Sequence, residues 1–271
     1  LTLFTALIFS SIVYSQSAIV WSPPIEVAGS SDAHRPRIEL LPDNSPVLIW
    51  SQFSGSSTKD YFFSKWSGTD FASPVLLNDV DILSYDWGGT EIVADGNTLY
   101  TVYKSSNVTF GKVFIRRSLD GGTTWENKIQ IEQPNELAMY PGVAAYDGNK
   151  VLVTYMTHGS GGINPQYIVR TSNDGGQTFS AGASVSANFG DEACYCCPPA
   201  LVGNTDYQVM SFRNDENNIR DMKAGVSTDG GVTFSTQISL DDHNWTLSSC
   251  PATGGDLVLN GSQLYLSLIH I

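Results

Sequence analysis

Three short stretches decide the fold: Ser118-Leu-Asp-Gly-Gly-Thr-Thr-Trp125, Ser172-Asn-Asp-Gly-Gly-Gln-Thr-Phe179 and Ser227-Thr-Asp-Gly-Gly-Val-Thr-Phe234. All three share the pattern Ser-x-Asp-Gly-Gly-x-Thr-aromatic. Their aspartates are spaced by 54 and 55 residues along the chain. A fixed period of this size predicts an array of repeated structural units.

Each copy has the chemistry of a hairpin turn. The paired glycines accept positive φ, and the carboxylates of Asp120, Asp174 and Asp229 can accept hydrogen bonds from nearby backbone N–H groups. The serine and threonine hydroxyls can tie the same turn internally. The aromatic residue that ends the pattern begins the next strand. We therefore expect three structural turns and no catalytic role for these aspartates.

Strands surround the turns in a repeating order. In the third unit, Gly142–Tyr146 and Lys150–Tyr155 alternate in β fashion on either side of Asp147-Gly148, which is a hairpin signal. Another strand then enters the Asp-Gly-Gly turn, and a last one follows its aromatic residue. Four strands per unit make up one blade of a β-propeller.

The repeated turn resembles the Asp-box, or bacterial neuraminidase, repeat of the sialidase superfamily. The resemblance implies an all-β, sialidase-like β-propeller of four-stranded blades, with the Asp boxes on the rim away from the substrate. Six blades of this length need roughly 325 residues, and the chain has 271. We therefore expect about four complete blades plus parts of others, in a chain truncated at both ends.

The opening segment is apolar as far as Ser15 and polar after it. It is too short to span a bilayer and is typical of a secretory signal peptide; a buried first strand is the alternative. We predict an incomplete signal peptide over residues 1–18 and a propeller domain over residues 19–271 that is truncated at the C-terminus. This organisation predicts a secreted, periplasmic or cell-surface protein without membrane insertion.

The charge balance restricts the class of partner. The chain carries 27 acidic and 14 basic residues, for a net charge of −13. Such an acidic surface argues against nucleic acid or an anionic membrane as the main partner. A local arginine cluster can still bind an anionic sugar, so we expect a glycan substrate.

Four cysteines lie late in the chain: Cys194, Cys196, Cys197 and Cys250. In an exported protein they favour disulfides. A bond between the neighbours Cys196 and Cys197 is disfavoured because its geometry strains a single peptide unit. Cys250 would then pair with one of the other three, and Cys194 could pair within that group. A zinc site of four thiolates is the alternative, but the spacing is not that of a standard finger, and we expect no metal and no cofactor.

The sialidase resemblance also implies site residues. Arginines bind a sugar carboxylate through two parallel hydrogen bonds, and a carboxylic acid protonates the leaving oxygen. The segment His34-Arg-Pro-Arg-Ile-Glu-Leu40 resembles the Tyr-Arg-Ile-Pro segment that carries the first arginine of the sialidase triad. Arg37 matches best and Arg35 is the second choice, although the usual proline after the isoleucine is missing. Asp60 occupies the place of the acid/base residue; an aspartate that caps a loop is the alternative.

A third segment completes the expected set. Glu192 resembles the glutamate that activates the nucleophilic tyrosine of sialidases, and Arg213 resembles the second triad arginine. The inserted Cys194-Tyr-Cys-Cys197 departs from ordinary sialidases. The third arginine and the nucleophilic tyrosine would lie beyond Ile271, so we expect an active parent protein and an inactive shorter chain.

These features predict an exported exo-α-sialidase-like glycoside hydrolase that acts on terminal sialic acids or related acidic sugars. A non-catalytic Asp-box propeller that binds glycans or proteins is the alternative. A propeller hydrolase that acts on another polysaccharide is a third hypothesis, because one fold can host several chemistries.

Overall fold

The structure is a computed structural model that describes residues 23–27, 32–54, 58–106, 111–134, 136–187 and 192–268. The predicted signal peptide lies outside the described residues. Strands dominate the described part, whose single helical element is the short 3-10 turn η1 (Ser160–Gly162). No described helix is both long and apolar enough to cross a membrane.

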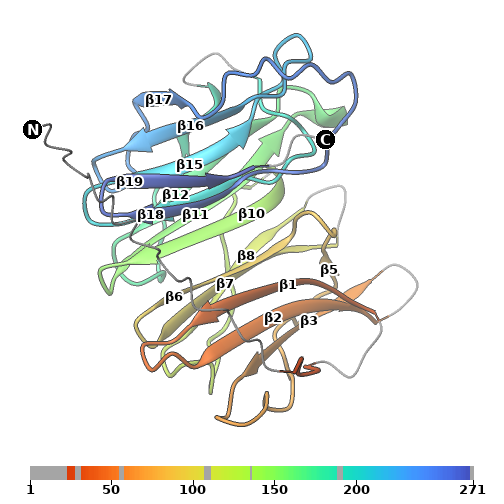
Figure 1. Cartoon of the computed structure of the whole chain (residues 1–271), viewed down its shortest axis with the longest axis vertical. Helices are drawn as coiled ribbons and strands as arrows, with labels where there is room; N and C mark the ends of the chain where they lie inside the picture. Colours follow the sequence, from red (N-terminus) through yellow and green to blue (C-terminus); the bar gives the residue numbers. More distant parts are fainter. Residues whose placement is uncertain are drawn as a thin grey trace, which may run out of the picture.

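Four antiparallel blades of four strands each follow one another along the chain, and the first two are hydrogen-bonded into a single nine-stranded sheet. The succession of blades can be followed in Figure 1. The first consists of β1 (Ala33–Leu40), β2 (Pro46–Phe53), β3 (Lys59–Lys65) and β4 (Val75–Leu76). The second consists of β6 (Thr90–Asp95), β7 (Thr98–Ser105), β8 (Val113–Ser118) and β9 (Ile129–Gln130). The short β5 (Ile82–Leu83) pairs with both β3 and β7 and so joins these two blades.

The third and fourth blades repeat the same order. The third consists of β10 (Leu137–Tyr146), β11 (Lys150–His158), β12 (Gln166–Ser172) and β13 (Ala183–Ser184). The fourth consists of β14 (Ala200–Gly203), β15 (Gln208–Arg213), β16 (Met222–Ser227) and β17 (Thr236–Ser239). A hairpin of β18 (Asp256–Asn260) and β19 (Gln263–Ser267) follows. Four blades plus part of a fifth confirm the predicted propeller architecture.

The core lies between the blades, because alternate residues of a strand face opposite sides of its sheet. On β7, Leu99 and Tyr103 pack against the first blade, and Tyr100 and Val102 pack against the third. Another cluster, which includes Phe212, joins the third and fourth blades. Each such buried side chain stabilises the fold by roughly 1.5–3 kcal/mol, so consecutive blades stabilise one another.

The three predicted turns connect β8 to β9, β12 to β13 and β16 to β17. In the first, Asp120 Oδ1 accepts hydrogen bonds from the Ser118 hydroxyl and the Thr124 backbone N–H, both at 2.8 Å. These bonds, led by the Thr124 N–H, lower the pKa of Asp120 to about 2. Asp174 and Asp229 make the same pattern of bonds. The turns therefore form as the sequence predicts, and their aspartates accept hydrogen bonds from the backbone of the turn.

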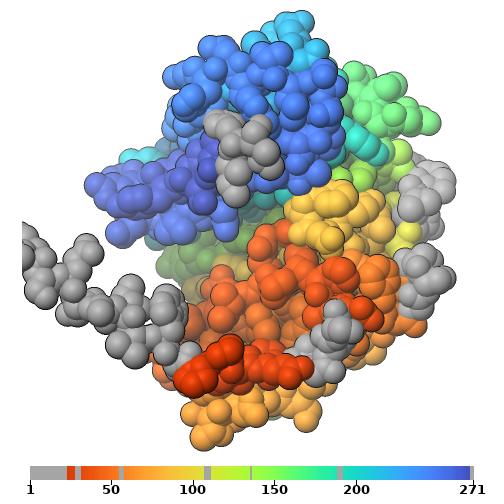
Figure 2. All heavy atoms as spheres, turned by 45° about the vertical axis from the view of Figure 1, so that its right-hand side comes forward, coloured from red at the N-terminus to blue at the C-terminus, as the bar shows by residue number. Residues whose placement is uncertain are grey.

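The innermost strands β1, β6, β10, β14 and β18 lie in succession around a central hollow. Figure 2 shows this hollow between the blue β18–β19 hairpin and the orange first blade. Ile38 of β1 and Val258 of β18 are 61% and 62% exposed. The inner strands therefore present apolar as well as charged side chains at the hollow.

Candidate functional site

All of the predicted catalytic and binding residues lie on one rim of the propeller. The Asp-containing turns follow the third strand of their blades, and the strands of each blade are antiparallel. On the opposite rim, the first and third strands of each blade therefore begin and the second strand ends. Arg35 is the third and Arg37 the fifth residue of the eight-residue β1, and Asp60 is the second residue of β3. Arg213 ends β15, and Glu192 precedes β14.

A cavity of about 630 Å³ occupies the hollow between the inner strands. Arg35, Arg37 and Glu39 line it from β1, and Glu91 lines it from β6. Asp256 lines it from β18, on the far side of the series of blades. Charged groups from three blades thus share one cavity.

Two arginines converge on one carboxylate at this cavity. Arg37 binds Glu91 through two bonds, Nε to Oε2 at 2.8 Å and Nη2 to Oε1 at 3.2 Å. Arg35 Nη2 donates to Glu91 Oε1, and its Nε donates to the Thr90 carbonyl at 3.4 Å. Two guanidinium groups share the Glu91 carboxylate, whereas Glu39 and Asp256 add two further carboxyl groups to the lining. The capacity to bind an anion therefore depends on the arginines themselves and not on the net charge of the cavity.

The sequence explains how both arginines reach Glu91. The register of β1 against β2 shifts between His34 and Arg37, and Arg35 has a φ of 48°. Pro36 lies inside this bulge, where its missing N–H costs no ladder hydrogen bond. The arginines also differ in access, because the Arg35 side chain is 6% exposed and the Arg37 side chain is 38% exposed. Arg37 is therefore the one that a ligand can reach.

Glu39 is a cavity residue that sequence reasoning missed. Burial raises its pKa to about 7, and the nearby Glu91 carboxylate acts in the same direction. The available signal was its spacing: Glu39 follows Arg37 by two residues on a strand, which places both side chains on one face. Glu91 gave no such signal, because only the packing of the second blade against the first brings it to the arginines.

Asp60 and Glu192 lie outside the set of described residues that line the cavity. Asp60 Oδ1 accepts a hydrogen bond from Asn78 Nδ2 at 3.4 Å, and Asn78 in turn accepts from the Tyr61 backbone N–H at 2.6 Å. Glu192 is exposed, and its carbonyl accepts from the Asp215 N–H at 2.7 Å. The structure does not bring these two carboxylates to the arginines of β1, and their catalytic assignments stay predictions.

Arg213 supports the cavity wall from behind. Its side chain is fully buried, and Nε donates to the Thr253 carbonyl at 3.0 Å. Nη1 donates to the Arg220 carbonyl, and the guanidinium lies 5.0 Å from the centre of the Trp245 ring. Because Thr253 lines the cavity and Arg213 does not, the contacts of Arg213 hold the wall in place.

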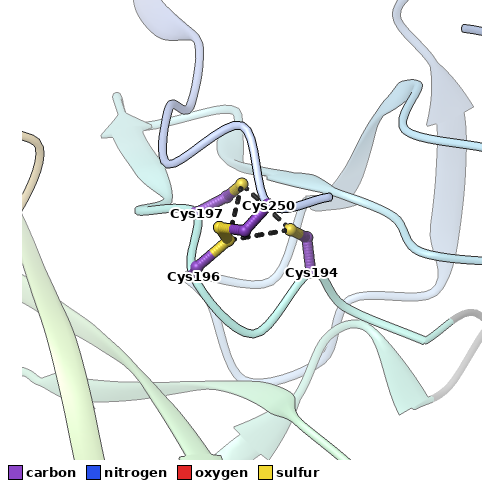
Figure 3. A group of neighbouring side chains, drawn as sticks. All are labelled: Cys194, Cys196, Cys197 and Cys250. Atoms are coloured by element: carbon purple, nitrogen blue, oxygen red, sulfur yellow. Dashed lines mark hydrogen bonds between the residues drawn. A yellow bond between two sulfur atoms is a disulfide. The ribbon is translucent and has the colours of Figure 1, made fainter. Parts of the chain in front are cut away.

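The four cysteines gather into one cluster (Figure 3). A disulfide joins Cys196 to Cys250, which confirms the expectation that Cys250 pairs with one of the other three. Cys194 and Cys197 are buried thiols whose sulfurs lie 3.0 Å apart. The hydrogen bond from Cys197 lowers the pKa of the Cys194 thiol below its ordinary value. These four sulfurs are the group in the described residues that could hold a metal ion.

An aromatic pair stands at the edge of the cavity. Trp87 is 37% exposed and stacks on Tyr85, with ring centres 4.9 Å apart and planes 12° apart. Trp87 also forms a wall of a second hollow of about 250 Å³, which His34 and Lys59 help to line. Exposed aromatic faces beside polar groups are typical of small-molecule sites.

No known protein family and no curated protein matches the sequence. Among solved structures, an α-L-arabinanase of Penicillium chrysogenum superposes with a TM-score of 0.60 at 13% identity, over 91% of this chain and 77% of that one. The α-L-arabinofuranosidase Arb93A of Fusarium graminearum gives 0.57 at 14% identity, over 90% and 77%.

The NanB sialidase of Streptococcus pneumoniae gives a TM-score of 0.51 at 12% identity, over 82% of this chain and 55% of that one. The chain shares the β-propeller fold of these proteins. At such low identity the likeness is one of fold alone, and it spans proteins named for arabinose and for sialic acid. The choice of sugar therefore depends on the residues of the cavity.

Proposed function

We propose that the protein is an exported glycoside hydrolase whose central cavity binds a terminal acidic sugar, with sialic acids as the first candidates. The observation that carries the proposal is the pair of β1 arginines on Glu91 beside a carboxyl group of raised pKa. The fold shared with an arabinanase, an arabinofuranosidase and a sialidase supports the glycosidase class. The disulfide supports export, because such bonds persist in oxidising compartments.

Arg37 is the group that receives the sugar carboxylate. Its guanidinium is already oriented by Glu91, so little side-chain entropy is lost when a second carboxylate binds. Arg35 is buried behind it and keeps Glu91 in place. An acidic sugar would form charge-assisted hydrogen bonds with the exposed part of the Arg37 guanidinium.

Glu39 is the general acid of this proposal. A carboxyl group with a pKa near 7 is substantially protonated at neutral pH and can give its proton to the leaving oxygen. Trp87 offers a flat apolar face against which a sugar ring can pack at the edge of the same cavity. The Asp60 assignment from the sequence is the competing one for the acid.

The test compares Glu39→Gln with Asp60→Asn in the hydrolysis of an aryl sialoside and an aryl α-L-arabinofuranoside. We expect the wild type to prefer the sialoside, and E39Q to lose at least about 100-fold in kcat, the range of general acid catalysis. D60N should retain most of the turnover. Loss of turnover in D60N with an active E39Q would transfer the role to Asp60, and preference for the arabinofuranoside would refute the acidic sugar.

A non-catalytic glycan-binding propeller is the second candidate. It is favoured by the positions of Asp60 and Glu192, which lie outside the cavity that holds the arginines. Under this alternative, acidic glycans bind at the β1 arginines without being cleaved. Binding on a glycan array, together with no hydrolysis of the bound glycans, would select it.

A further inference from the structure

The cysteine cluster has the dimensions of a metal-thiolate centre. Its sulfurs all lie within 4.8 Å of one another. The edges from Cys194 to Cys196, Cys194 to Cys197 and Cys196 to Cys197 measure 3.5, 3.0 and 3.9 Å. Four thiolates at about 2.3 Å from a tetrahedral zinc ion are spaced by about 3.8 Å. These three edges are within about 1 Å of that spacing. The sulfurs of Cys196 and Cys250 are joined in a disulfide, so they must be reduced and move apart before an ion can enter.

Backbone donors surround three of the four sulfurs. The Ala252 N–H points at Cys250 Sγ, with an N–S distance of 3.3 Å. The Cys196 N–H faces the Cys194 sulfur, and the Thr253 N–H faces the Cys197 sulfur. N–H groups directed at sulfur stabilise thiolates, and outer-shell hydrogen bonds of this kind orient the ligands of metal centres.

Two buried arginines lie near the cluster and partly offset the negative charge of such a centre. A divalent ion with four thiolates carries a net charge of −2, and Arg213 and Arg220 act electrostatically on Cys197 and Cys194. Within the described part of the chain, Arg213 Nη2 is buried without a hydrogen-bond partner. Arg220 is paired with Asp215, so Arg213 is the cation whose charge is left to compensate the cluster.

We propose that the four cysteines, when reduced, bind one zinc-like divalent cation as a tetrahedral tetrathiolate centre, and that the Cys196–Cys250 disulfide is the oxidised form of this site. A dithiol reductant gives two electrons and two protons to the disulfide and itself becomes a disulfide. The four thiols then release four protons as their sulfurs bind the cation. The chemistry selects a thiophilic ion, because the site offers sulfur ligands alone.

The metal–thiolate centre would stabilise the cavity wall. It joins the segment before β14 to the segment before β18, and residues of both, Pro198, Thr253 and Gly254, line the cavity. These segments are already in close contact, because a Cβ on Gly254 would lie 2.1 Å from the Pro198 carbonyl oxygen. Cation binding therefore stabilises the wall against local opening, whatever ligand the cavity takes.

The experiment uses the fact that the chain has four cysteines in all. The protein is reduced, freed of reductant without air, and titrated with Zn²⁺ against a chromophoric chelator and with Co²⁺ as a spectroscopic probe. We expect one ion per chain, the absorption of tetrahedral cobalt–thiolate, and protection of all four thiols from alkylation.

Variants separate this site from a cluster of disulfides alone. Cys194→Ser and Cys250→Ser should each weaken Zn²⁺ binding by more than about 100-fold, since each removes a ligand. Ser249→Ala, which neighbours Cys250 but removes no sulfur, should bind as the wild type does. A reduced protein that takes up no Zn²⁺, or a C194S variant with unchanged affinity, would overturn the proposal. These readouts do not involve sugar binding or hydrolysis, so they stand apart from the proposed function.

Discussion

At the scale of single residues, burial beside another carboxylate makes Glu39 the most perturbed acid of the cavity. Its folded pKa of about 7 lies above the ordinary value of 4.5, so the folded protein holds this proton more tightly than the unfolded chain. The resulting stability is fully present below about pH 4.5 and is lost as the pH rises through 7. Glu39 therefore costs stability at the pH where it serves as an acid.

Glu39→Gln should accordingly stabilise the protein above pH 7 and leave its stability unchanged near pH 4, because glutamine never ionises. The gain should be about 1–2 kcal/mol, after allowance for solvent at a half-buried group. Thermal unfolding of both proteins across this pH range measures it. A gain of the same size at pH 4 would show that packing, and not ionisation, is responsible.

Sequence reasoning selected Arg35 and Arg37, which both line the cavity, although their role in sugar binding stays a prediction, and it did not find their partner Glu91. Arg35 and Arg37 could be found because a local motif carries them. Glu91 could not, because it lies more than fifty positions away and reaches the arginines through the packing of two blades. The full burial of Arg213 was equally hidden, since its contacts come from the segment before β18.

At the scale of elements, the Asp-Gly-Gly turns also pack against the neighbouring blade. In the turn after β16, Gly230 and Gly231 have φ values of 78° and 83°. A Cβ on Gly231 would lie 2.6 Å from Leu152 Cδ2, on β11 of the third blade, whereas a Cβ on Gly230 would meet no atom within 4 Å. Gly230 is thus needed for the positive φ of the turn. Gly231 is needed for the same reason and also because a side chain there would collide with the neighbouring blade.

Gly231→Ala should therefore destabilise the protein by about 2–4 kcal/mol, through positive φ and overpacking together. Gly230→Ala should cost only about 1 kcal/mol, through its backbone conformation. Chemical denaturation of the two variants measures the difference. Equal losses would mean that the turn does not depend on its contact with Leu152.

The turns were also the most predictable elements of the chain. Their pattern is short, local and chemically complete, so the sequence alone places them and the strands around them. The two-residue strand β5, which links the first two blades, carries no comparable sequence pattern. It forms because it pairs with β3 and β7. Asp60 shows the same limit, since its position on β3 was predictable but its partner Asn78 was not.

At the scale of the whole molecule, the period of the turns predicted the series of blades, and the series creates the central cavity. No single blade contains the site, because Arg37, Glu91 and Asp256 belong to three different blades. The cysteine cluster has the same character, since it joins two segments more than fifty residues apart. We propose that this shared cavity binds an acidic sugar through Arg37.

Calorimetric titration with N-acetylneuraminic acid and L-arabinose tests this claim most directly, because it requires binding and not turnover. The account predicts that the acidic sugar binds at least tenfold more tightly than the neutral one. Arg37→Ala should weaken that binding by roughly 10- to 100-fold, as expected for a lost hydrogen bond between charged groups. Arg117→Ala, which breaks an ion pair with Glu126 outside the cavity, should leave it unchanged. Equal affinity for the two sugars, or undiminished binding by R37A, would contradict the account.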